Sequence, residues 1–376
     1  MTAGQGAGGQ GAGGQGTGEQ GAGEQGTGEQ GAGGKKRLFG HTVVNLSHGA
    51  GGKATHALVE AIFLEAFANP MLAPLNDGAV VSVAGRPVAF TTDSFVVSPI
   101  FFAGGCLGDL AVNGTVNDLA ACGAQPLALS AGFVIEEGFP VADLQRVVAA
   151  MAAAAGAAGV PIVTGDTKVV ERGKGDGCYV NTSGIGLVDE RATSLSASAA
   201  RPGDQVLVSG PIGDHGTAVM LARGTLGISA DIVSDTAPLN GLVKALLEAA
   251  GTAVHVLRDA TRGGVATVLN EVAGASGVAV VLDETALPVR PEVAGVCELL
   301  GLDPLYVACE GRMVVVVAKE AAPDALRAMR AHPLGAGSVV IGEVVAEPAG
   351  LVLENTGFGG ARVVDMLVGD PLPRIC

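Results

Sequence analysis

Four aspartates in the first half of the chain are the side chains best suited to chemistry. They are Asp77 in LNDGAV, Asp93 in FTTDSF, Asp118 in VNDLAA and Asp166 in VTGDTK. Each follows an apolar run or lies among small residues, where a carboxylate contributes little to packing. Mg²⁺ takes oxygen ligands and commonly shares them with substrate phosphates. A single aspartate of this kind is more simply a cap of a helix or turn, but four together favour a site for magnesium and a phosphate compound.

Lys168 follows the last of these aspartates by two residues, in the motif GDTK. An ammonium group at this place could neutralise charge on a transferring phosphate or on a leaving oxygen. A lysine on the protein surface explains the same spacing equally well. The motif by itself therefore leaves both interpretations open.

Two glycine-rich segments precede predicted helices. HGAGGK, residues 48–53, lacks the G-x-x-x-x-G-K-[ST] spacing of a phosphate loop, but Gly51 and Gly52 could still present amides to an anion. DATRGG begins with Asp259 and repeats an acid, a base and a glycine pair in the second half. Glu310 in CEG precedes the apolar run RMVVVVA, where a buried carboxylate needs a partner or a function.

The chain ends in PLPRIC, so a thiol is its last side chain. Pro371 and Pro373 cannot continue a helix or donate to a sheet, which predicts a short extended arm. The neighbouring α-carboxylate raises the pKa of the Cys376 thiol, so this cysteine does not activate itself as a nucleophile. No C-x-x-C pair occurs, and we interpret the other cysteines as buried small apolar residues: Cys106, Cys122, Cys178, Cys297 and Cys309.

The composition excludes several classes of function. The 376 residues carry a net charge of -15, which repels nucleic-acid backbones and anionic membranes. Tryptophan is absent and aromatic residues are 3%, too few for a stacking platform for single-stranded nucleic acid. No continuous run of apolar residues is long enough to span a membrane, and the N-terminus lacks the pattern of a secretory signal, so we expect a cytoplasmic protein.

Residues 1–37 are dominated by a G-[AT]-G-[GE]-Q repeat, which predicts a disordered tail. The remaining chain mixes helical and strand patterns without strict βαβ alternation, which predicts an α+β fold. We expect two domains over residues 38–198 and 199–350, followed by a terminal segment over 351–376. The clearest predicted helices are GCLGDLAVNGTVNDLAACGA, PVADLQRVVAAMAAAAGAAG and one starting near Leu239.

HGAGGK, FTTDS, NDLAACGA, VTGDTKVV, DATRGGV and the terminal PRIC together resemble the hydrogenase maturation factor family HypE. That family is part of the superfamily of aminoimidazole-ribonucleotide synthetase, selenophosphate synthetase and thiamine-phosphate kinase. The resemblance spans roughly residues 43–376, and PRIC is its most specific element. It implies a two-domain aminoimidazole-ribonucleotide-synthetase-like α+β fold, a homodimer that pairs the N-terminal sheets, and a flexible C-terminal tail.

The resemblance also implies an activity, an ATP-dependent carbamoyl dehydratase that acts on its own C-terminus. In that family the carbamoyltransferase HypF places a carbamoyl group on the terminal cysteine. ATP then drives its dehydration to a thiocyanate, and the cyanide passes to iron on a HypC–HypD complex during [NiFe]-hydrogenase assembly. Phosphorylation of the amide oxygen would turn a poor leaving group into a good one.

Carried over to this chain, the resemblance implies a role for each candidate residue. Cys376 is the tethered carrier, Lys168 stabilises charge on the oxygen, and Glu310 removes protons from the nitrogen. The remaining residues bind Mg²⁺ on the triphosphate (Asp77, Asp93, Asp118 and Asp166) or assist in the nucleotide site (Asp259, Gly51 and Gly52).

Two alternatives stay open at this point. One is another superfamily member, such as a selenophosphate synthetase or thiamine-phosphate kinase, which leaves PRIC without a purpose. The other is a carrier whose nucleotide site is inert, which leaves the acidic residues and Lys168 without one.

Overall fold

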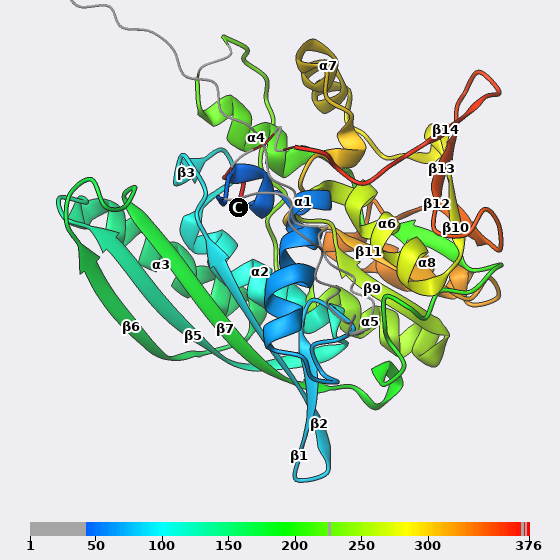
Figure 1. Cartoon of the computed structure of the whole chain (residues 1–376), viewed down its shortest axis with the longest axis horizontal. Coiled ribbons are helices and arrows are strands. Elements are labelled where there is room, and N and C mark those ends of the chain that lie inside the picture. Colours follow the sequence, from blue (N-terminus) through cyan, green and yellow to red (C-terminus); the bar gives the residue numbers. More distant parts are fainter. Residues whose placement is uncertain (1–42, 225–226, 370–371, 373) are drawn as a thin grey trace, which may run out of the picture. The chain divides into compact units, whose positions relative to one another are not determined.

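A computed structural model describes residues 43–224, 227–369, 372 and 374–376 of the chain. The glycine-rich repeat and the boundary predicted at residue 37 lie outside these residues. Residues 39–376 contain a five-stranded sheet, a seven-stranded sheet and one short strand pair (Figure 1).

The five-stranded sheet is formed by the predicted N-terminal domain. Its order is β1 (Ala79–Val83), β2 (Arg86–Phe95), β7 (Cys178–Val188), β5 (Ala124–Glu136) and β6 (Ile162–Val170). Only β5 and β6 pair in parallel, and helix α3 (Val141–Ala158) connects them. Every second residue of β7 is buried, because one face of this sheet packs on helix α2 (Leu107–Ala121).

The seven-stranded sheet belongs to the second domain. Its order is β14 (Ala361–Val363), β13 (Val352–Asn355), β10 (Ala279–Asp283), β12 (Val339–Val345), β8 (Gln205–Val208), β11 (Met313–Val317) and β9 (Val254–Asp259). Strands β13 and β14 extend this sheet past residue 350. The terminal segment that the sequence predicted from residue 351 therefore begins inside the second sheet.

Strand β11 shows that both faces of the second sheet are covered by helices. All five of its residues are buried. Met313, Val315 and Val317 enter a core shared with α5 (Asn240–Ala250) and α8 (Ala322–Ala331). Val314 and Val316 enter a second core with α6 (Gly264–Ser276). A strand buried on both faces has a continuous apolar sequence, as RMVVVVA does.

The remaining elements are shorter. They are η1 (Leu46–Gly49), α1 (Lys53–Leu58) with its continuation η2 (Val59–Leu64), β3 (Phe101–Phe102), β4 (Gly105–Cys106), η3 (Glu190–Ala192), α4 (Asp214–Ala222), η4 (Gly251–Ala253), η5 (Glu284–Ala286), α7 (Pro291–Leu300), η6 (Pro304–Tyr306) and η7 (Pro333–Gly335). The sequence patterns did not predict α4. Seven of its nine residues are buried, so no polar face marks a helical period.

Helix α3 is, among the described residues, the one helix long and apolar enough to cross a membrane by length and composition. Its buried residues, including Val147, Met151 and Ala155, recur at helical spacing and join the core that contains α2. One apolar stripe of this kind is typical of an amphipathic helix in a folded core.

Candidate active site

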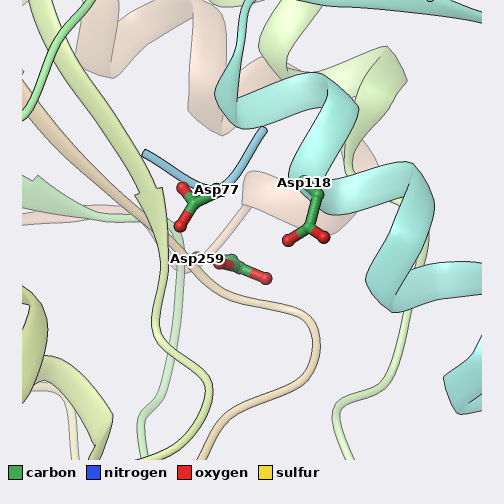
Figure 2. A group of neighbouring side chains, drawn as sticks. All are labelled: Asp77, Asp118 and Asp259. Atoms are coloured by element: carbon green, nitrogen blue, oxygen red, sulfur yellow. The ribbon is translucent and has the colours of Figure 1, made fainter. Parts of the chain in front are cut away.

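Three carboxylates, one buried and two half-buried, meet where the two domains contribute to one site. Asp77 lies in the loop before β1, Asp118 on α2, and Asp259 at the end of β9 (Figure 2). One oxygen from each lies within 4.8 Å of the others. Thr91 Oγ1 joins the first two, at 2.8 Å from the Asp77 carbonyl oxygen and 2.9 Å from Asp118 Oδ2.

Burial strongly perturbs this acid cluster of Asp77, Asp118 and Asp259. It raises the pKa of Asp77 to about 6 and that of Asp259 to about 8, and the pKa of Asp118 lies well above its ordinary value. The negative charges of neighbouring carboxylates add to the effect on Asp118 and Asp259. Arg258 opposes it, with its Nε 3.1 Å from Asp77 Oδ1.

Closely spaced, desolvated oxygen donors fit a hard divalent cation. A bound Mg²⁺ would compensate the mutual repulsion of the acid cluster and would keep several positions for phosphate oxygens and water. The donor set offers no sulfur or imidazole ligand that would favour a softer metal. The three residues that would hold Mg²⁺ are therefore Asp77, Asp118 and Asp259.

We expect Mg²⁺ binding to release protons and to weaken as the pH falls from about 8 to about 6. Metal binding requires deprotonated carboxylates, and the raised pKa values of Asp259 and Asp77 cover this range. Calorimetric titration in two buffers of different ionisation enthalpy measures the protons released. Asp324→Asn changes an exposed carboxylate on α8 and serves as the control. Proton release that does not depend on pH would contradict the assignment.

Asp93 lies beside the acid cluster, whereas Asp166 does not. Asp93, near the end of β2, lines the same pocket of about 280 Å³ as the three carboxylates, and burial raises its pKa. Asp166 lies on β6, at the edge of the sheet, where its Oδ2 accepts a hydrogen bond from Lys168 Nζ at 2.5 Å. Both side chains are 68% exposed.

The carboxylates that lie together in this chain therefore differ from the predicted set of four aspartates. Asp259 joins Asp77 and Asp118, while Asp166 and Lys168 lie apart from them. The sequence could not show this, because GDTK does not reveal that its strand ends up at the edge of the sheet. The roles predicted for Asp166 and Lys168 remain predictions.

The HGAGGK segment contacts the C-terminal segment. The amide of Lys53 donates to the carbonyl of Leu367 at 3.0 Å, and the amide of Gly51 donates to Thr55 Oγ1 at 2.9 Å. A Cβ at Gly52 would lie 2.2 Å from the Leu367 carbonyl oxygen, so this close approach requires glycine. Gly51 also lines the acidic pocket. The nucleotide-binding role predicted for this loop remains a prediction.

The chain end is docked instead of extending freely. The Val96 amide donates to an α-carboxylate oxygen of Cys376 at 3.0 Å, and the Ser98 amide donates to the Arg374 carbonyl at 3.1 Å. Ile375 is 3% exposed, and Arg374 pairs with Asp176. These bonds come mainly from the main chain, so the docked path does not depend on the thiol.

Cys376 lies between charged groups of the site. Burial raises the pKa of its thiol far above the ordinary value, and Arg262 opposes this effect. The charges of Glu310, Asp93 and Asp259 raise the pKa further. The docked thiol is therefore protonated at neutral pH, which agrees with the expectation that it is not a self-activated nucleophile.

Glu310 is a buried acid near the chain end. It is 2% exposed, and burial, followed by the charges of Asp259 and Asp93, raises its pKa well above the ordinary value. Among the described residues, its Oε1 has no hydrogen-bond partner. A buried carboxyl oxygen without a partner is suited to accept a hydrogen bond or a proton from a substrate.

Arg262 is a site residue to which the sequence assigned no role. It lines both the pocket around Cys376, about 70 Å³ in volume, and the acidic pocket. The signal was present in DATRGG, where the base follows Asp259 at the entry to α6. An adjoining pocket of about 470 Å³ shares Arg262, Asp77 and His56 with the acidic pocket. The combined space is large enough for a nucleotide beside the tail.

Comparison with known proteins defines first the class and then the family. Residues 75–188 match the N-terminal domain of the AIR synthase related proteins, and residues 201–353 match the C-terminal domain of the same proteins. The chain is thus a two-domain protein of the AIR synthase related class. It is 55% identical to the carbamoyl dehydratase HypE of Rhizobium leguminosarum bv. viciae over 89% of this chain and 95% of the relative. The chain belongs to the HypE family.

Relatives and solved structures extend this similarity. The carbamoyl dehydratase HypE of Escherichia coli (strain K12) is 47% identical over 89% of this chain and 99% of its own length. A crystal structure of HypE in complex with ATP is 48% identical, with a TM-score of 0.74 over 88% of this chain and 99% of that chain. A HypE–HypF complex reaches a TM-score of 0.79 at 50% identity, over 83% of this chain and 100% of that chain.

Proposed function

We propose that this chain is an ATP-dependent carbamoyl dehydratase that acts on its own Cys376 during [NiFe]-hydrogenase maturation. One observation carries the proposal: Arg262 lines both the pocket of the terminal cysteine and the pocket of the acid cluster. The carrier and the phosphate site are therefore adjacent within one chain. Tethering makes the reaction intramolecular and raises the effective concentration of the reacting group.

The reaction converts the thiocarboxamide, ATP and no other reactant into a thiocyanate, ADP, phosphate and a proton. The carbamoyl oxygen takes the terminal phosphoryl group of ATP and leaves as phosphate when the carbon–oxygen bond breaks. The first nitrogen proton is released when the oxygen is phosphorylated and a carbon–nitrogen double bond forms. The second is lost as the triple bond forms and ends on the departing phosphate. Mg²⁺ supplies charge neutralisation on the triphosphate.

Each step assigns work to residues of this chain. Asp77, Asp118 and Asp259 would hold the cation in the acidic pocket. Arg262 holds a positive charge beside the oxygen that receives the phosphoryl group. Glu310 accepts a proton from the nitrogen, because its buried Oε1 has no hydrogen-bond partner among the described residues and burial raises its pKa, which makes it a stronger base.

The assay of the proposed function uses the chain after carbamoylation by HypF with carbamoyl phosphate and ATP. Mass spectrometry of the C-terminal peptide then follows the loss of one water when ATP and Mg²⁺ are added to the isolated carbamoylated protein. An unmodified Cys376 together with continued ATP hydrolysis would instead support a kinase. Absence of ATP hydrolysis with and without the carbamoyl group would support a carrier with an inert nucleotide site.

We expect Arg262→Ala to slow dehydration by about a hundredfold, the usual effect of removing one charge-stabilising donor. Arg262→Lys keeps the charge and should recover part of the rate, and Arg327→Ala changes an exposed arginine on α8 as the control. Single-turnover rates on carbamoylated protein provide the measurement. If Arg262→Ala keeps the full rate and Lys168→Ala loses it, the role belongs to Lys168, as the sequence predicted.

The proposal includes two protein partners and a second copy of the chain. The solved HypE–HypF complex supports HypF as carbamoyl donor, and the HypC–HypD complex is the proposed cyanide acceptor in the cytoplasm. A homodimer is supported by exposed apolar residues on the five-stranded sheet: Phe90 at 47%, Leu127 at 49%, Val134 at 40% and Ile185 at 41% exposure. Light scattering of the purified chain measures its mass in solution.

A further inference from the structure

His215 connects the end of the chain to a buried loop. It lies on α4 and is fully buried, with its Nε2 2.8 Å from the carbonyl oxygen of Ile375 and its Nδ1 2.8 Å from Ser234 Oγ. A carbonyl oxygen only accepts, so the Nε2–H donates to Ile375 and Nδ1 accepts from the serine hydroxyl. The edge of the Phe102 ring packs at 5.4 Å between centroids and restricts the imidazole orientation.

Ser234 determines which nitrogen of His215 carries the proton. Its Oγ also accepts the amide of Thr236 at 3.1 Å, so its hydroxyl proton is directed to the imidazole. Burial lowers the pKa of His215, which therefore remains neutral at physiological pH. The neutral tautomer with the proton on Nε2 is the one that can hold the Ile375 carbonyl.

Asp235, in the same loop as Ser234, also contacts Glu310. Asp235 Oδ1 accepts the backbone amide of Glu310 at 2.9 Å. A Cβ at Gly311 would lie 1.8 Å from the Asp235 carbonyl oxygen, so only glycine permits this contact. Asn117 Nδ2 donates to the Glu310 carbonyl at 3.2 Å and links the same region to α2. The loop therefore contacts Glu310 directly. Through His215 it is also connected to Ile375, the residue before Cys376.

We propose that His215 is a positioning residue for dehydration: it holds the backbone of Ile375 so that the group on Cys376 faces Glu310, with residues 234–236 as the common support. This inference rests on the proposed function, because it names the residue that places the carrier in that site. The hydrogen bond from His215 adds to the main-chain bonds of Val96 and Ser98 with the tail, and its modest strength still permits release of the tail to a partner protein.

The experiment compares His215→Leu with His215→Gln in the full chain. We expect His215→Leu to raise the rate at which iodoacetamide alkylates Cys376 by up to about tenfold, because one neutral hydrogen bond no longer favours the docked tail. Glutamine can still donate to the Ile375 carbonyl, so the alkylation rate of this variant should remain close to that of the chain without substitutions. The C-terminal peptide reports Cys376, and the five buried cysteines report any general unfolding.

Dehydration of the carbamoylated variants gives the second measurement. We expect the single-turnover rate of His215→Leu to fall by about tenfold or more, with the ATP concentration for half-maximal rate unchanged. Recovery by His215→Gln distinguishes positioning of the tail from a general role in folding. Unchanged alkylation of Cys376 in a His215→Leu protein with unchanged melting temperature would overturn the proposal.

If His215→Leu does not fold, Ser234→Ala decides the question. It removes one of the two hydrogen-bond partners that orient the imidazole of His215, so alkylation of Cys376 should still increase, and an unchanged rate overturns the proposal. Alkylation is measured without ATP and without a carbamoyl group. If the carbamoylated chain without substitutions fails to dehydrate, the proposed function is refuted, and the alkylation result is not affected.

Discussion

We expect Cys376→Ala to abolish thiocyanate formation completely and to leave the fold and ATP binding unchanged. The sulfur is the atom that carries the carbamoyl group, so no other side chain at this position can replace it. The tail should remain docked, because the Val96 amide donates to the α-carboxylate of residue 376 and Ile375 supplies the buried contact. Mass spectrometry after treatment with HypF, carbamoyl phosphate, ATP and Mg²⁺ measures the modified product.

A second cysteine variant provides the matched control. Cys178 is buried on β7, outside the pockets around the chain end and the acid cluster. Cys178→Ala removes a similar small side chain, so we expect a modest loss of stability, about 1 kcal/mol, and normal thiocyanate formation. Thiocyanate found on another cysteine of the Cys376→Ala protein would contradict the assignment of Cys376 as the carrier.

We expect Glu310→Gln to slow dehydration of pre-carbamoylated protein by about a hundredfold to ten-thousandfold, the range typical of removing a general base. Glutamine has nearly the same volume and cannot take up a proton. The contact to Asp235 uses the backbone amide of residue 310, so the substitution leaves it in place. The variant therefore tests proton transfer with little change in packing.

The pH dependence provides a further test of the same residue. A base acts when it is deprotonated, and the pKa of Glu310 is raised, so the dehydration rate should increase as the pH rises through that value. The residual rate of Glu310→Gln should lack this increase. Glu298→Gln, at an exposed position on α7, is the control. Full dehydration by Glu310→Gln would remove Glu310 from the mechanism.

Local patterns predicted much of the first domain. The helix that carries Asp118 and the helix predicted in PVADLQRVVAAMAAAAGAAG are both present. These features depend on periodic burial over a few residues, which a sequence records directly. Helix α4, which carries His215, was missed because its residues are buried on nearly all sides and show no such period.

The sequence by itself determined the chemical groups of this protein: carboxylates for a cation, a buried acid in CEG, and a thiol as the last side chain. Only the tertiary structure decided which of them meet. It brings Asp259 from the second domain to Asp77 and Asp118, and it places Asp166 and Lys168 on an edge strand. It also joins His215 to Ile375 across 160 positions of the chain. Such pairings depend on sheet order and on the packing of distant segments, and no local spacing encodes either of them.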